Sequence, residues 1–155
     1  MKDLYYMKEA IKEARLAYDQ DEVPIGCVIV LEDKIIARGH NTVEQDKLAI
    51  SHAEINAIKA ASEFLGDWRL DKTTMYITKE PCAMCAGAIF KSRIKRLVIG
   101  ARDLKMGCAG SLYNLVDDDN FNHKVEITYD VMADESVQLL QEFFKEKRRG
   151  AEQDE

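Results

Sequence analysis

The sequence predicts a single α/β domain, and three observations predict it. Short apolar runs typical of buried strands recur at 26–31, 73–78 and 96–100. A helical pattern separates the second run from the third, which indicates a crossover between two parallel strands. The 155 residues are enough to bury one hydrophobic core. We therefore expect one domain over residues 1–150, followed by a mobile acidic tail over 151–155.

Each expected element has a local reason in the sequence. Apolar residues at spacings of three and four predict helices, and apolar runs bounded by turn residues predict strands. In chain order, we expect a helix over 4–18, strands over 26–31 and 34–38, a helix over 52–65, a strand over 73–78, a helix over 81–90, strands over 96–100 and 125–129, and a helix over 134–149. The remaining long segments are expected to be mostly loop over 42–51 and irregular over 101–123, with one short helix at 111–116.

Capping residues and glycines set the ends of these elements. Asp3 and Asp134 stand where an acidic side chain can cap the first and last helices. Gly66 and Gly150 are expected to end the helices that precede them. Residues 39–41 are expected to leave the second strand, because the glycine at 39 permits unusual dihedrals.

Charge and hydropathy narrow the classes of function. No apolar run approaches the roughly 20 residues that span a membrane, and the N-terminus lacks the apolar segment of a signal peptide, so we expect a cytoplasmic protein without a membrane partner. The net charge of −6 argues weakly against a nucleic-acid partner. Two runs, 91–96 and 145–149, nevertheless carry four positive charges each. Each run is either an ordinary solvated face or a local basic face for RNA.

Cys82 and Cys85 are the most informative pair in the chain. They follow Pro81, and proline suits a first helical turn because its missing N–H needs no partner there. A spacing of three places both sulfur atoms on one helix face, where the positive end of the helix dipole favours thiolates. Upstream, His52 and Glu54 open another helix, at a spacing that suits one metal ligand with a carboxylate beside it. His52, Cys82 and Cys85 are together a zinc-type ligand set.

Three protein ligands favour a catalytic zinc, since a structural zinc has four. Cys27 or Cys108 could supply a fourth ligand, and this structural alternative stays open. A redox pair of cysteines is disfavoured by the histidine and glutamate upstream. Glu54 is then the natural general acid and base, which takes a proton from water and returns it to a ring nitrogen or a leaving amine. The simpler alternative for Glu54 is a carboxylate that stabilises a helix start.

The order His-x-Glu followed by Pro-Cys-x-x-Cys is the signature of zinc nucleobase deaminases. Beyond this signature, the chain closely resembles the bacterial tRNA-specific adenosine deaminases (TadA). The segments that carry the resemblance are 22–26, Gly39 with Asn41, 52–54, 80–88, 92–94, 100–103, 107–112, 122–123 and 143–144. One departure precedes His52, where 48–51 read Leu-Ala-Ile-Ser in place of the frequent Asp-Pro-Thr-Ala.

The resemblance implies a three-layer α/β/α, cytidine-deaminase-like fold, with a five-stranded mixed sheet and helices on both faces. It implies a cytoplasmic homodimer with one zinc ion per subunit, held by His52, Cys82 and Cys85. The implied reaction is hydrolytic deamination of adenosine to inosine at the wobble position of a tRNA anticodon, usually of an arginine tRNA. In that reaction zinc-bound hydroxide attacks C6 of the flipped adenine while Glu54 shuttles protons.

The resemblance also implies a set of contacts with the anticodon stem-loop. Asn41 and the backbone at Ala53 match positions beside the flipped base. The other matched positions are Asp103 and Lys105 on a loop, and Phe144 and Arg148 on the C-terminal helix. From the residues alone, Asn41 also suits a turn residue that bonds local backbone.

Two other functions remain open at this point. The first is a zinc deaminase of a free base or nucleoside such as guanine or cytidine, because pocket shape sets the substrate of such sites. The second is a zinc-stabilised RNA-binding module without catalytic activity. That module requires a fourth protein ligand to the metal, from Cys27 or Cys108.

Overall fold

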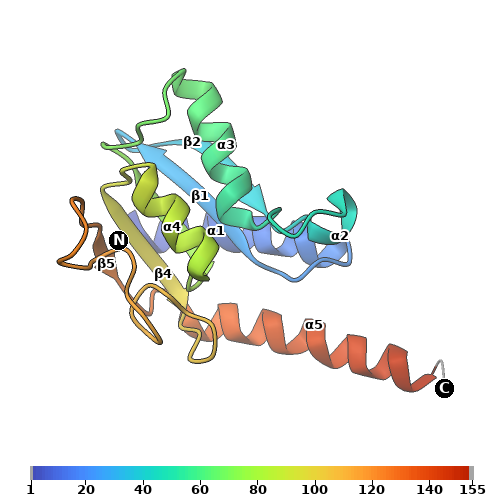
Figure 1. The fold of residues 1–155 in the computed structure, drawn as a ribbon. Helices are drawn as coiled ribbons and strands as arrows, with labels where there is room; N and C mark the ends of the chain where they lie inside the picture. Colours follow the sequence, from blue (N-terminus) through green and yellow to red (C-terminus); the bar gives the residue numbers. More distant parts are fainter. Residues whose placement is uncertain (1, 154–155) are drawn as a thin grey trace.

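The computed structural model describes residues 2–153, which form a sheet with helices packed on it (Figure 1). The elements are α1 (Lys2–Asp19), β1 (Gly26–Leu31), β2 (Lys34–His40), α2 (Val43–Asp46), α3 (Ala53–Leu65), β3 (Thr74–Lys79), α4 (Ala83–Lys91), β4 (Arg96–Ala101), β5 (Glu126–Thr128) and α5 (Ala133–Gln153). All five predicted strands are present, and so are the four long helices.

The strands form one mixed sheet in the order β2-β1-β3-β4-β5. β1 is antiparallel to both β2 and β3, whereas β3, β4 and β5 run parallel. The helix α4 makes the predicted crossover between the parallel strands β3 and β4. The carboxyl ends of these two strands therefore meet at one edge of the sheet, which is where ligands bind in open α/β folds.

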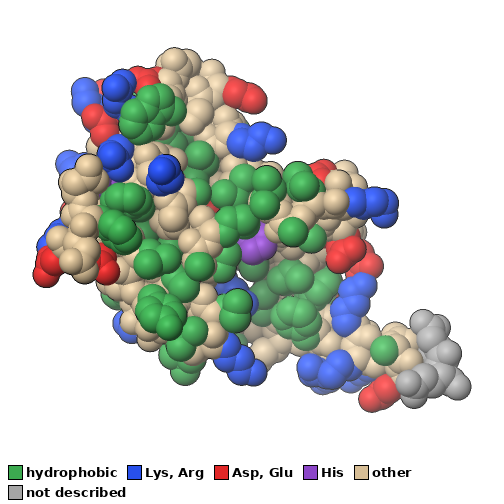
Figure 2. Space-filling view, in the orientation of Figure 1, with side chains coloured by type: hydrophobic (Ala, Val, Ile, Leu, Met, Phe, Trp, Pro, Cys, Tyr) green, Lys and Arg blue, Asp and Glu red, His purple; other side chains and the backbone are tan. Residues whose placement is uncertain are grey.

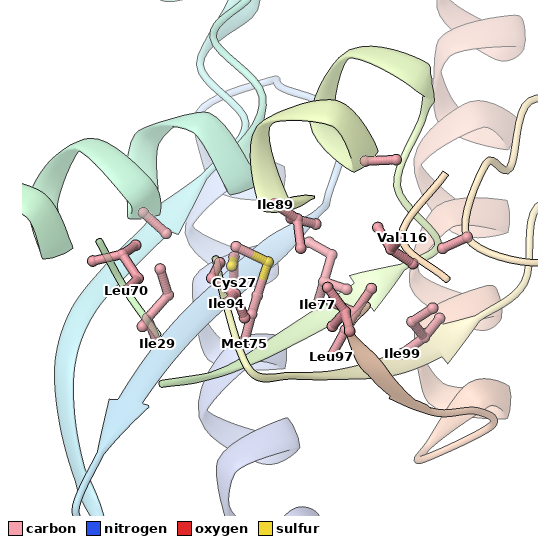
Figure 3. Close-up of a cluster of buried hydrophobic side chains, with 14 of the residues drawn as sticks. Cys27, Ile29, Leu70, Met75, Ile77, Ile89, Ile94, Leu97, Ile99 and Val116 are labelled. Carbon is pink, nitrogen blue, oxygen red and sulfur yellow. The ribbon is translucent and has the colours of Figure 1, made fainter. Parts of the chain in front are cut away.

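Helices cover both faces of the sheet, and the core is accordingly double. Alternate residues of β1 face opposite layers: Cys27 and Ile29 join the cluster under α3 and α4, while Val28 and Val30 join the cluster under α1. Figure 3 shows the first cluster, where Ile89 of α4 lies over sheet residues that include Met75, Ile77 and Leu97. The amino-terminal ends of α3 and α4 are thereby held above the same part of the sheet.

The glycine at 39 allows α3 to approach the sheet closely. A Cβ atom at Gly39 would lie 2.5 Å from the carbonyl oxygen of Ala53 and 2.7 Å from the backbone nitrogen of Ala57. Both Gly39 and His40 belong to β2. This corrects the prediction that the chain leaves the strand at residue 39. Any side chain at position 39 would push away the helix that begins beside His52.

Two other predictions of local structure are wrong. Asp3 lies inside α1, where it accepts hydrogen bonds from Arg96 at 2.7 and 2.8 Å and from Tyr76 at 2.8 Å, so it does not cap the helix. The segment 42–51 is mostly loop as predicted, around the short helix α2. The segment 111–116 is not helical and holds only the isolated bridge between Ala109 and Asn114.

The C-terminal helix is longer than predicted. α5 begins at Ala133, so Asp134 is in its first turn, and it continues past Gly150 to Gln153. Of the acidic tail predicted to be mobile, residues 151–153 are helical, and 154–155 lie outside the described residues. Within residues 2–153 no helix combines the length and the apolar character that crossing a membrane requires.

Candidate active site

Two helix starts bring a metal-type ligand set together. His52 is the N-cap residue of α3, and Cys82 is the N-cap residue of α4, with Cys85 in the first turn of that helix. Pro81 thus precedes the helix and does not occupy its first turn as predicted. The Nδ1 atom of His52 lies 3.7 Å from the Sγ atom of Cys82 and 3.5 Å from that of Cys85.

The three ligand atoms fit a zinc ion. They all lie within 4.8 Å of one another. Zinc bonds of about 2.3 Å to sulfur and about 2.0 Å to imidazole nitrogen separate tetrahedral ligand atoms by about 3.5 Å, which matches the two nitrogen–sulfur distances. Neither Cys27 nor Cys108 belongs to the group found among residues 2–153. A structural site closed by a fourth cysteine is therefore not the arrangement of this fold.

The surroundings of Cys82 favour its thiolate, which is the form that binds a metal ion. A hydrogen bond from Cys85, together with one from His52, lowers the pKa of the Cys82 thiol to about 4. Helix starts also stabilise negative charge, because their unpaired N–H groups point toward it. Cys27, by contrast, lies buried in β1, and burial raises its pKa well above the usual range, so that it stays a neutral packing residue.

Glu54 lies beside the ligand group without belonging to it. Its side chain is 4% exposed in the first turn of α3. Burial raises the pKa of its carboxyl group to about 7. A carboxyl group that titrates near neutral pH can both accept and donate a proton, which a helix-capping glutamate would not need to do.

A cavity of about 1230 Å³ reaches this group at His52, which is the one member of the group in its lining as described (Figure 2). Asn41, His52 and Ala53 line its inner part, and the aromatic side chains of Phe143 and Phe144 line the side formed by α5. Three of the six predicted substrate contacts, Asn41, Ala53 and Phe144, thus share one cavity. Glu22 and Lys79 line it as well, although the sequence analysis did not single them out. In the sequence, each of these two residues is simply a charged residue at the edge of an apolar segment, which does not by itself indicate a place in a cavity.

The other three predicted contacts lie around this cavity. Asp103 forms an ion pair with the cavity residue Lys79, with 3.2 Å between Oδ2 and Nζ. Arg148 lines a neighbouring groove of about 280 Å³ together with Phe144 and Arg102. Lys105 is exposed on the loop after β4 and lines neither space.

Asn41 is placed for an external partner. It is buried and lines the cavity, its backbone N–H donates to the carbonyl of Ile25, and no hydrogen bond of its side-chain amide to the protein is found among residues 2–153. Asn56 of α3 holds the preceding chain by donating to the carbonyl of His40 and the hydroxyl of Thr42. The amide of Asn41 therefore does not bond local backbone, as a turn residue would.

The two basic runs differ in their relation to the cavity. In the run 145–149, Lys147 lines the cavity and pairs with Asp21 at 2.6 Å, and Arg148 lines the adjacent groove. In the run 91–96, Arg96 is engaged by Asp3 inside the fold, and none of the run lines the cavity. The C-terminal run is the one next to the candidate site.

Known proteins of similar sequence and structure agree with this arrangement. The MafB19-like deaminase family matches residues 1–148. The tRNA-specific adenosine deaminase of Bacillus subtilis (strain 168) is 48% identical over 147 residues, which cover 95% of this chain and 91% of that protein. A solved structure from "Biochemical and Structural Studies of A-to-I Editing by tRNA:A34 Deaminases at the Wobble Position of Transfer RNA" matches with a TM-score of 0.84 and 40% identity, over 88% of this chain and 99% of that one.

A guanine deaminase structure from Bacillus subtilis matches less completely, with a TM-score of 0.61 and 36% identity over 63% of each chain. The match to the A34 deaminase structure confirms the predicted cytidine-deaminase-like fold with its five-stranded mixed sheet. On sequence, fold and ligand group together, the chain belongs to the tRNA-specific adenosine deaminase family.

Proposed function

We propose that this chain deaminates the wobble adenosine of a tRNA to inosine, with release of ammonia. The observation that carries the proposal is the placement of His52, Cys82 and Cys85 beside the buried Glu54, next to a cavity lined by Asn41. His52, Cys82 and Cys85 would hold one zinc ion per chain. Zinc bound there supplies the Lewis acidity that makes water acidic enough to act as a nucleophile near neutral pH.

The side chains of this chain supply the proton transfers and the orientation. Glu54 accepts a proton from the attacking water and delivers it to N1 of the adenine ring. It then takes the second proton from the new hydroxyl on C6 and passes it to the amino group, which leaves as ammonia as the C6 carbonyl forms. Burial keeps Glu54 away from bulk water, so the proton it accepts is retained for the next transfer. Asn41 offers a free amide to the flipped base, with the backbone of Ala53 beside it.

The size of the cavity favours a nucleic-acid substrate over a free base. Its volume of about 1230 Å³ exceeds the roughly 300–1000 Å³ of small-molecule pockets. Phe143 and Phe144 line it beside Lys147, and aromatic side chains next to cations suit unstacked bases and phosphates of single-stranded RNA. An anticodon loop presents such bases, whereas a free purine would leave most of this space to water.

The proposal includes three further points: an arginine tRNA as substrate, a homodimer, and action in the cytoplasm. Each rests on the family resemblance. The homodimer is testable by light scattering of the purified protein, and the choice of tRNA by comparing stem-loops of different anticodons that all carry a wobble adenosine.

The function is tested by incubating the zinc-loaded protein with an anticodon stem-loop that carries the wobble adenosine. Free adenosine, guanine and cytidine are incubated in parallel, and products are identified by mass spectrometry. We expect inosine in the RNA and no product from the free compounds. Product from a free base alone would replace this proposal by a free-base deaminase, and no product from any substrate would favour the non-catalytic alternative.

A further inference from the structure

Glu80 is a buried carboxylate for which the reaction has no use. It directly follows β3 and precedes Pro81 and Cys82, and it is 3% exposed. Four donors surround its two oxygen atoms. Oε1 accepts the backbone N–H of Asp103 at 3.2 Å and the hydroxyl of Ser111, and Oε2 accepts the backbone N–H groups of Ala109 at 3.1 Å and Ser111 at 3.0 Å.

All four donors come from one irregular loop, residues 102–113, which we call the rim loop. Further backbone bonds tie it to the same strand end: Cys108 N–H donates to Pro81 at 2.9 Å, and Glu80 N–H donates to Ala101 at 2.8 Å. Gly107 packs directly against the Glu80 carboxylate, so that a Cβ atom at position 107 would overlap it. The rim loop is therefore built around Glu80 and not around its own hydrogen bonds alone.

The rim loop lies between the cavity and the groove on α5. Asp103 reaches the cavity through its ion pair with Lys79, and Arg102 lines the groove with Phe144. The loop also exposes Leu104 and Tyr113, which are 77% and 69% exposed. Figure 2 shows hydrophobic side chains gathered over this part of the molecule. Of these side chains, the Tyr113 ring and the Arg102 guanidinium are of the kinds on which unpaired RNA bases stack.

We propose that Glu80 is a positioning residue for RNA binding: it fixes the rim loop in the register that places Asp103 beside Lys79 at the cavity and Arg102 in the groove with Phe144. Glu80 itself touches no substrate. Because its carboxylate is the only acceptor shared by residues 103, 109 and 111 within the described chain, losing it releases both ends of the loop together. This inference rests on the proposed function, because it takes RNA to be the substrate.

The test compares Glu80→Gln with the wild-type protein on the anticodon stem-loop. The amide keeps the size of the side chain but turns an N–H₂ group toward N–H donors, so at least one of the loop bonds is lost. We expect KM for the RNA to rise about tenfold or more, with kcat within about twofold and zinc content unchanged, which is the pattern of lost binding without lost chemistry. Glu63→Gln, at an exposed position on α3, is the matched control and should leave both constants unchanged.

A second variant keeps the test decisive if Glu80→Gln folds poorly. Ser111→Ala removes only the hydroxyl donor to Glu80 and should raise KM a few-fold. If the two residues act as one unit, the double variant should show less than the sum of the two effects on ln KM.

Hydrogen exchange separates this inference from the proposed function. The amides of 103, 109 and 111 should exchange faster in Glu80→Gln whatever the substrate is. Faster exchange with an unchanged KM for the RNA would overturn the positioning role, as would a loss of kcat or of zinc at constant KM. If the wild-type protein forms no inosine in RNA, the proposed function fails first, and Glu80 then has no RNA to position.

Discussion

The Nδ1 atom of His52 lies 3.5 Å from the Sγ atom of Cys85, although 33 residues separate them in the chain. The two residues belong to the starts of α3 and α4, which pack on one face of the sheet. The ligand set thus exists only where both helices are docked. Metal binding, helix packing and activity should therefore respond together to substitutions in this region.

Replacing one ligand should remove the metal. In Cys85→Ser a weak neutral ligand replaces a thiolate, and we expect zinc affinity to fall by more than about 100-fold, beyond what the loss of an outer-shell partner costs. Metal analysis of the purified protein measures this directly. Cys108→Ser is the matched control and should retain one zinc ion per chain. Loss of zinc from this control would instead support the alternative in which Cys108 is a fourth ligand of a structural zinc.

Asn41→Ala should weaken the reaction on RNA without affecting the metal. Removing an amide that bonds a flipped base leaves the polar groups of that base unpaired, at a cost of about 1–3 kcal/mol, or roughly 5- to 150-fold in kcat/KM. Steady-state kinetics on the stem-loop gives the ratio. An unchanged kcat/KM would show that Asn41 only shapes the chain between β2 and α2.

Gly39→Ala should disturb the site through packing. The added methyl group would lie 2.5 Å from the carbonyl oxygen of Ala53, so α3 must move, at a cost of about 1–3 kcal/mol in the free energy of unfolding. Activity should fall too, because His52 and Glu54 are at the start of this helix.

The matched change is Gly87→Ala in α4, where nothing lies within 4 Å of the added atom. Alanine should stabilise this helix by about 0.5–1 kcal/mol. Thermal unfolding of both variants tests the pair of predictions. If the two changes shift the melting temperature in the same direction, then the close approach of α3 does not prevent a side chain at position 39.

The bond between Asp3 and Arg96 predicts a pH-dependent contribution to stability. Hydrogen bonds from Arg96, followed by one from Tyr76, hold the pKa of Asp3 below its ordinary value of 3.8. The unfolded chain therefore binds more protons near that pH, so this contribution is present above about pH 4 and is lost as the pH falls below it. Asp3→Asn should cost about 1–2 kcal/mol at pH 7, allowing for partial exposure of the pair.

Denaturant unfolding at several pH values measures the difference between the wild-type protein and Asp3→Asn. The difference should shrink as the pH falls below about 4. Asp33→Asn is the control, because Asp33 pairs with Lys2 on the open surface, where both side chains are about 70% exposed. If the difference in unfolding free energy between the wild-type protein and Asp3→Asn is the same at pH 7 and at acid pH, the ionised carboxylate of Asp3 is not what stabilises the fold.

The sequence predicts the parts of the fold that depend on local patterns. β1 is a continuous apolar run, β3 is rich in β-branched and aromatic residues, β4 is apolar after Arg96, and Gly66 ends α3 in a left-handed conformation. The ligand set is equally local in origin, since each helix start contributes a short motif. Their convergence could be inferred only because both motifs belong to one known signature.

Two of the differences in local structure depend on hydrogen-bond partners that lie outside the segment itself. The helix α2 was missed because its first N–H groups are bound by Glu22, at 2.9 Å from Glu44 and 2.8 Å from Gln45, and not by a neighbouring cap. The helix predicted at 111–116 does not form, because N–H groups of the segment bond to carbonyls before it: Leu112 donates to Gly107 and Leu115 to Cys108, each at 2.9 Å. No pattern within either segment reveals such a partner.

Glu54 is proposed to drive hydrolysis of a wobble adenosine in RNA. This role is tested by inosine formation in the anticodon stem-loop, in water labelled with heavy oxygen, by the wild-type protein and by Glu54→Gln. We expect heavy-oxygen inosine at the wobble position for the wild type, and a rate roughly 100- to 10,000-fold lower for the variant at equal zinc content and RNA affinity. Equal rates, or inosine without the label, would contradict this role of Glu54.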